Sequence, residues 1–163
     1  MRLSRLKKKW VAATVGAAVI GVFATVALGS PGSMFGITGT EIYVTANLDD
    51  SVHQNSDRVK FQTKDPTYVR VQKIVIGAGG YSGWHHHPGI AIVAVLSGTV
   101  KFTNSDCSST THVAGTAFVE GGDDPGQASS VGGATVLATF VAPNNGPVTS
   151  TTFRTDDPLV SCP

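Results

Sequence analysis

Hydrophobic and polar residues alternate in short segments along most of the chain, which is the pattern of half-buried β-strands. In residues 67–76, one face of such a strand would carry Tyr68, Arg70, Gln72 and Ile74. The same reasoning predicts strands over residues 41–47, 58–63, 67–76, 90–96, 99–103, 111–114, 117–120, 134–142 and 148–153. Ser97 and Gly98 predict a tight hairpin turn between two of them. Many short strands, Gly-rich turns and no convincing helix after residue 30 predict an all-β sandwich or barrel.

The N-terminus departs from this pattern. Residues 10–28, nineteen in number, are apolar, and five basic residues precede them: Arg2, Arg5, Lys7, Lys8 and Lys9. A helix of that length extends roughly 28 Å, close to the ~30 Å hydrocarbon core of a bilayer. We therefore predict a signal peptide or a membrane anchor over residues 1–29, with the basic end in the cytoplasm. The rest of the chain would then be extracytoplasmic, either secreted or anchored, with a flexible linker over 30–40 and one domain over 41–163.

Composition and charge agree with a β domain and exclude one class of partner. The chain is rich in Gly, Thr, Val and Ser, and only 14% of its residues are charged. Without the five N-terminal basic residues, seven Lys and Arg face eleven Asp and Glu, a net charge of −4. Nucleic acids require clustered basic residues on the folded domain, so no nucleic-acid partner is predicted.

The strongest candidates for a binding or catalytic site are the three consecutive histidines at positions 85–87. Side chains alternate along a strand, so His85 and His87 would share one face and His86 would lie on the other. Two imidazoles on one face can chelate a transition metal or line a polar pocket. The seven apolar residues 90–96 follow, as expected of a strand buried on both faces, which places the histidines near the mouth of a barrel.

This stretch resembles the first motif of the cupin family, G-x5-H-x-H-x3-E-x6-G, in which Gly79, His85, His87 and Gly98 match and Ala91 replaces the glutamate. The second motif, G-x5-P-x-G-x2-H-x3-N, starts at Gly115, but Gly121 and Gly126 stand where proline and histidine are usual. Over residues 41–163 the chain is similar to small exported cupins common in actinobacteria. The resemblance implies a double-stranded jelly-roll barrel and a metal shell of three histidines and a glutamate, of which two ligands carry over.

Any third metal ligand must therefore come from elsewhere, and the sequence leaves four candidates: Glu120, Asp123, Asp124 and Gln127. An acidic residue there would complete a two-histidine, one-carboxylate set suited to Fe, Mn, Zn or Ni. Asp123 and Asp124 also begin D-D-P-G, an ordinary turn sequence. The alternative is a metal-free pocket. The residues expected to line the pocket in either case are His85, His87, Ala91, Trp84 and Gln127, with open volume left by the missing glutamate.

The only two cysteines, Cys107 and Cys162, predict one disulfide in an exported chain, as in similar exported cupins. Three functions remain open at this stage. They are a small-molecule-binding barrel, a metal-dependent enzyme of the dioxygenase or isomerase type, and a structural exported barrel without catalysis. No catalytic residue is assigned. The expected partners are a small-molecule ligand, the membrane through the N-terminal segment, and a second copy of the chain in a homodimer.

Overall fold

A computed structural model describes residues 34–157, 160 and 162, and in this part of the chain it contains nine strands and no helix. The strands are β1 (Phe35–Leu48), β2 (His53–Ser56), β3 (Val59–Gln62), β4 (Thr67–Tyr81), β5 (His85–Asn104), β6 (Ser109–Val113), β7 (Ala117–Ser130), β8 (Ala134–Pro143) and β9 (Thr155–Asp156). The predicted all-β fold is confirmed for the described residues. None of them forms a helix long and apolar enough to cross a membrane. The segment predicted as signal peptide or anchor, residues 1–29, lies outside them.

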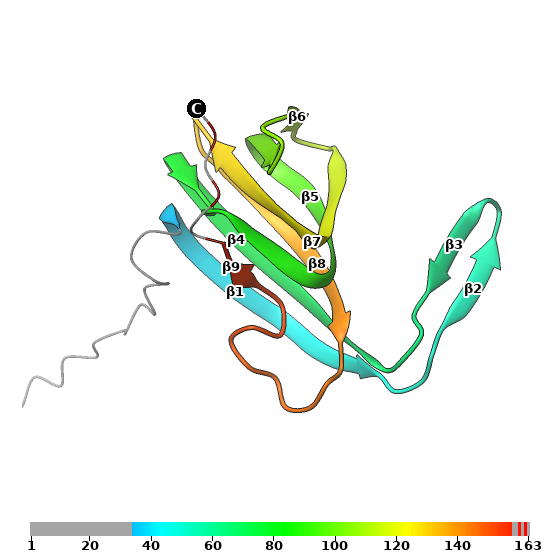
Figure 1. Cartoon of the computed structure of the whole chain (residues 1–163). Coiled ribbons are helices and arrows are strands. Elements are labelled where there is room, and N and C mark those ends of the chain that lie inside the picture. Colours follow the sequence, from blue (N-terminus) through cyan, green and yellow to red (C-terminus); the bar gives the residue numbers. More distant parts are fainter. Residues whose placement is uncertain (1–33, 158–159, 161, 163) are drawn as a thin grey trace, which may run out of the picture.

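Four long strands close around a common interior. β4 pairs with β8, β8 with β5, β5 with β7, and β7 with the end of β4, where Gly80 is paired with Ser130. β1 extends this layer beside β4 and β6 extends it beside β5, whereas the β2–β3 hairpin projects away from the body (Figure 1). The closed, curved sheet is consistent with a jelly-roll barrel.

The core lies inside this barrel and follows the two-residue period of the strands. Every second residue of β8 is buried, from Ala134 to Ala142, and Ala91, Val93 and Val95 of β5 are buried beside them. The prediction that residues 90–96 are buried on both faces is wrong. Ile92 and Leu96 are 41% and 53% exposed, because the outer face of β5 is open to solvent at these two positions.

Several predicted boundaries also need correction. β1 starts at Phe35, so much of the predicted linker 30–40 is a strand, paired along β4. Ser97 and Gly98 do not form a hairpin, because β5 runs through them. Gly98 bends the strand with a φ of +76° while remaining paired with Ala134. The D-D-P-G sequence lies within β7 rather than in a turn.

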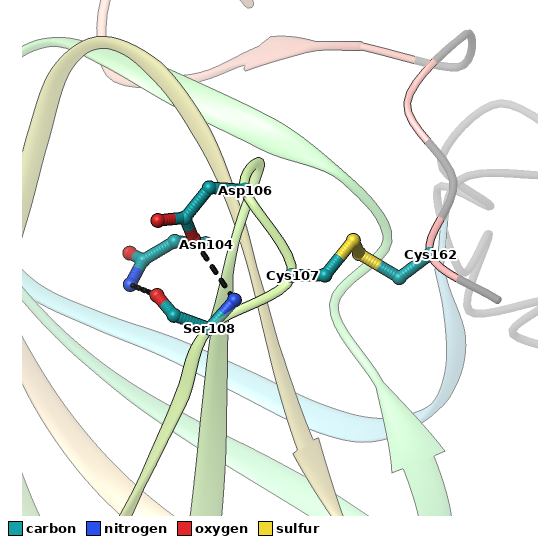
Figure 2. Close-up of a disulfide and its surroundings, with 5 residues drawn as sticks. All are labelled: Asn104, Asp106, Cys107, Ser108 and Cys162. Atoms are coloured by element: carbon teal, nitrogen blue, oxygen red, sulfur yellow. Dashed lines mark hydrogen bonds between the residues drawn. A yellow bond between two sulfur atoms is a disulfide. The ribbon is translucent and has the colours of Figure 1, made fainter.

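The C-terminal segment after β8 is irregular, not the strand predicted over 148–153, yet it is anchored at several points. Phe153 is 5% exposed in the core, and β9 pairs with His85 and His86. Cys162 forms the predicted disulfide with Cys107, with the two Cα atoms 5.6 Å apart (Figure 2). The segment therefore lies against the start of β5, where the histidines are.

Candidate metal centre and cavity

The three histidines at the start of β5 divide between the two faces of the strand. His85 and His87 are each 5% exposed and point inward, and their rings meet edge to face with centroids 4.8 Å apart. His86 lies on the outer face, where its Nδ1 is 2.7 Å from the Asp157 carboxylate. The C-terminal segment thus holds the middle histidine, and the other two face the interior.

Backbone carbonyls fix the orientation of both inward imidazoles. The Nδ1 of His85 lies 2.9 Å from the carbonyl oxygen of Gly83, and the Nδ1 of His87 lies 2.5 Å from that of Phe153. A carbonyl oxygen can only accept, so each Nδ1 carries a proton and donates it. In the neutral imidazoles the lone pair is then on Nε2. Metal-ligating histidines are usually held in this way.

His85 is kept neutral by its surroundings. Burial is the largest cause that lowers the pKa of His85, to about 4, and the positive charge of Arg154 and the neighbouring His87 add to it. Glu120 and the Gly83 carbonyl act in the opposite direction without cancelling the effect. Near pH 7 the Nε2 of His85 is therefore available as a ligand or an acceptor.

A carboxylate completes the group from a neighbouring strand. In the pairing of β5 with β7, Ala91 lies opposite Glu120, so Glu120 occupies the place beside the position where the first cupin motif has its glutamate. Its Oε1 is 3.5 Å from the Nε2 of His87, and its side chain is 11% exposed. One ligating atom each from His85, His87 and Glu120 lie within 4.8 Å of one another.

Of the four candidate third ligands, Glu120 is the one that joins the two histidines. Asp123 and Asp124 are exposed on β7, and Gln127 is half-buried further along it. The sequence could not separate these residues, because the choice depends on how β5 and β7 are aligned.

The group opens into a cavity of about 260 Å³ inside the barrel. Its wall is mainly apolar, with Ile74, Val136 and Phe140 among the lining residues, and its polar groups include Arg70, Gln72, Ser82 and Arg154. The predicted pocket residues Trp84, Ala91 and Gln127 do not line it. The two arginines were not singled out from the sequence. Strand alternation groups Arg70 with Gln72 and Ile74, but does not tell which face is inside.

These residues fit a transition metal. Two imidazole nitrogens and a carboxylate are the donors that Fe, Mn, Zn and Ni share, and all three face the same space. The Nε2 of His87 is buried and has no hydrogen-bond partner among the described residues. A buried polar atom without a partner is costly, and a cation between His87 and Glu120 would satisfy both.

Comparisons with known proteins give structural neighbours only. No protein-family model matches the chain, and no curated protein is similar to it in sequence. A conserved protein of unknown function from Streptococcus pyogenes is 21% identical, over 61% of this chain and 75% of that chain, with a TM-score of 0.44. A cupin superfamily protein from Desulfitobacterium hafniense is 14% identical, over 60% of this chain and 76% of that chain, with a TM-score of 0.41.

A salicylate 1,2-dioxygenase from Pseudaminobacter salicylatoxidans is 15% identical, with a TM-score of 0.41, over 44% of this chain. The chain spans only 20% of that enzyme's length, and the dioxygenase activity is the neighbour's. Some of the structural neighbours of this chain are cupin superfamily proteins.

Proposed function

We propose that this chain is an exported cupin-type barrel that binds a divalent transition metal through His85, His87 and Glu120, and a small molecule in the cavity beside them. The observation that carries the proposal is the buried Nε2 of His87, unpartnered among the described residues and 3.5 Å from the Glu120 carboxylate. Export is supported by the charge and hydropathy of residues 1–29 and by the disulfide, which persists in oxidising compartments.

The chain's own residues prepare the site for such a ligand set. The carbonyls of Gly83 and Phe153 hold both Nε2 atoms toward the cavity, so no imidazole has to turn when an ion binds. The apolar wall limits competing water around the bound small molecule. When bound, the metal would act as a Lewis acid toward an oxygen of that molecule.

Two further functions are open to test. Catalysis of the dioxygenase or isomerase type is favoured by the small number of protein ligands, since catalytic metal sites keep a coordination position open. A metal-free pocket is favoured by the direct approach of Glu120 to His87, although 3.5 Å is longer than an ordinary hydrogen bond.

Metal binding by the purified full-length chain tests the proposal. We expect about one equivalent of Mn²⁺ or Zn²⁺ per chain by elemental analysis, and at least ~100-fold weaker binding in His87→Ala and Glu120→Ala, since changes to groups that only support ligands already cost 10–100-fold. Asp123→Asn is the matched control, a change of an exposed carboxylate three residues along β7, and should bind as the wild type does. A wild-type chain that stays metal-free at saturating ion concentration would contradict the proposal.

A second-site exchange tests the position of the carboxylate. Ala91 and Glu120 are paired across β5 and β7, so a glutamate at either position reaches the same side of the histidines. We expect the double variant Ala91→Glu, Glu120→Ala to recover at least ~10-fold of the metal affinity lost in Glu120→Ala alone, because it again supplies two imidazoles and a carboxylate. A double variant that is folded by circular dichroism but binds no better than Glu120→Ala counts against this geometry.

A further inference from the structure

Arg70 places a second polar group in the same cavity as the three candidate metal ligands. It comes from β4, lines the cavity with Gln72 and Ile74, and its guanidinium carbon lies 3.9 Å from the centroid of the Phe153 ring. Its Nε donates to the hydroxyl of Thr45 at 3.1 Å. The Nε–Thr45 bond and the ring contact fix the guanidinium plane, and the hydrogens on its two terminal nitrogens remain as further donors.

The charge of Arg70 has no acidic partner among the described residues. The other cavity arginine, Arg154, is neutralised by Asp156, with nitrogen–oxygen distances of 2.6 and 2.7 Å. Arg70 forms no ion pair within the part of the chain that the structure describes, and burial lowers its pKa. The positive charge of Arg70 therefore remains available to an anionic group that enters the cavity.

Arg70 and Glu120, one of the three candidate metal ligands, lie in one row across the barrel wall. Arg70 of β4 is paired with Phe140 of β8, Phe140 with Ala91 of β5, and Ala91 with Glu120 of β7. Three strand spacings of ~4.8 Å place Arg70 and Glu120 about 14 Å apart along the curved wall. Phe140 lies between them and lines the cavity, so an apolar surface joins the two polar ends.

We propose that Arg70 binds the carboxylate of a small organic acid, whose apolar body lies against Phe140 and whose far end points to His85, His87 and Glu120. A carboxylate fits because the planar guanidinium fork matches it and a single positive charge balances it. A phosphate dianion would call for more donors than this one residue offers. The inference deepens the proposed function and rests on it for what the far end of the ligand meets.

Binding of benzoate and of its neutral analogue benzamide to the full-length chain tests the proposal. The two probes have nearly the same shape and differ in the charge that Arg70 would recognise. By calorimetry we expect benzoate to bind at least ~10-fold more tightly than benzamide, and Arg70→Met to remove this difference, because methionine keeps an apolar stem but no charge. Lys73→Met, which removes a positive charge of β4 that does not line the cavity and is paired with Glu41, is the matched control and should keep the preference.

Other outcomes of these binding experiments contradict the proposal or one part of it. Equal binding of benzoate to the wild type and to Arg70→Met, with both chains folded, overturns the proposal, as does no benzoate binding at all. Tighter Arg70-dependent binding of inorganic phosphate overturns the carboxylate assignment. The titrations are made with and without Mn²⁺. If Mn²⁺ fails to bind while the Arg70-dependent preference for benzoate remains, the metal proposal fails and the carboxylate site stands. If Mn²⁺ binds but benzoate is not preferred over benzamide, the carboxylate site fails and the metal proposal stands.

Discussion

At the scale of single residues, the site depends on the pairing of a very small side chain with an acidic one. Ala91 is fully buried and is paired with Glu120, whose carboxylate lies 3.5 Å from the Nε2 of His87. The Nδ1 atoms of the two imidazoles donate hydrogen bonds to the backbone carbonyls of Gly83 and Phe153. Two histidines of β5 and a glutamate of β7, distant from them in the sequence, therefore present their ligating atoms to one space.

The buried, neutral state of His85 predicts a stability that depends on pH. In the metal-free chain its pKa is lowered to about 4, against about 6.5 when unfolded. Between these values the unfolded state binds more protons, so stability is fully present above pH 6.5 and falls as the pH drops toward 4. The loss is on the order of 3 kcal/mol. Urea unfolding with a chelator present should show the decline, and His85→Gln should flatten it. An unchanged pH profile in His85→Gln would be evidence against this assignment.

At the scale of elements, β5 organises the barrel because it changes partners along its length. Its first half pairs with β8, and beyond Gly98 it pairs with β6, while β7 lies beside both halves. The bend depends on Gly98, whose φ is +76°. Its backbone also lies close to Gly133, so that an added Cβ would be 2.1 Å from the carbonyl oxygen of Gly133. Both conditions disfavour a side chain at this position.

Gly98→Ala should therefore destabilise the fold by about 2 kcal/mol or more, from the strained φ together with the backbone collision. Gly79→Ala is the matched control. Gly79 has a similar φ of +72°, but a Cβ there meets no atom within 4 Å, so only the conformational cost of about 1 kcal/mol applies. Chemical unfolding of the two variants measures both effects. Equal destabilisation would show that the close approach of the two strands is not what restricts position 98.

At the scale of the whole molecule, the alternating pattern predicts most of the strands, since a half-buried strand requires it over a few residues. The alternation also places His85 and His87 on one face. It does not select Glu120 over Asp123 or Asp124, because that depends on the alignment of β5 with β7. Nor does it show that Phe153, in an irregular segment, fills the core and holds His87. Such features arise from contacts between distant parts of the chain.

The C-terminal segment links the disulfide to the site. Cys162 is joined to Cys107 in the turn after β5, where the Asp106 carboxylate accepts from the Ser108 amide and Asn104 donates to the Ser108 hydroxyl (Figure 2). Between the disulfide and the barrel, the Asp157 amide donates to the Trp84 carbonyl, and Arg154 donates to the Ser82 carbonyl. These contacts position the Phe153 carbonyl that orients His87.

Replacing both cysteines by serine should therefore have two effects. The crosslink closes a loop of 55 residues, so its loss should lower the free energy of unfolding by about 4 kcal/mol in the chain-entropy model. Metal affinity should also fall, by roughly 10-fold, because the freed segment holds the Phe153 carbonyl less firmly against His87. Chemical unfolding and metal titration of the folded variant measure the two effects, and wild-type chain treated with a thiol reductant is the control. If stability falls while metal affinity stays at the wild-type value, the segment stabilises the barrel without positioning His87.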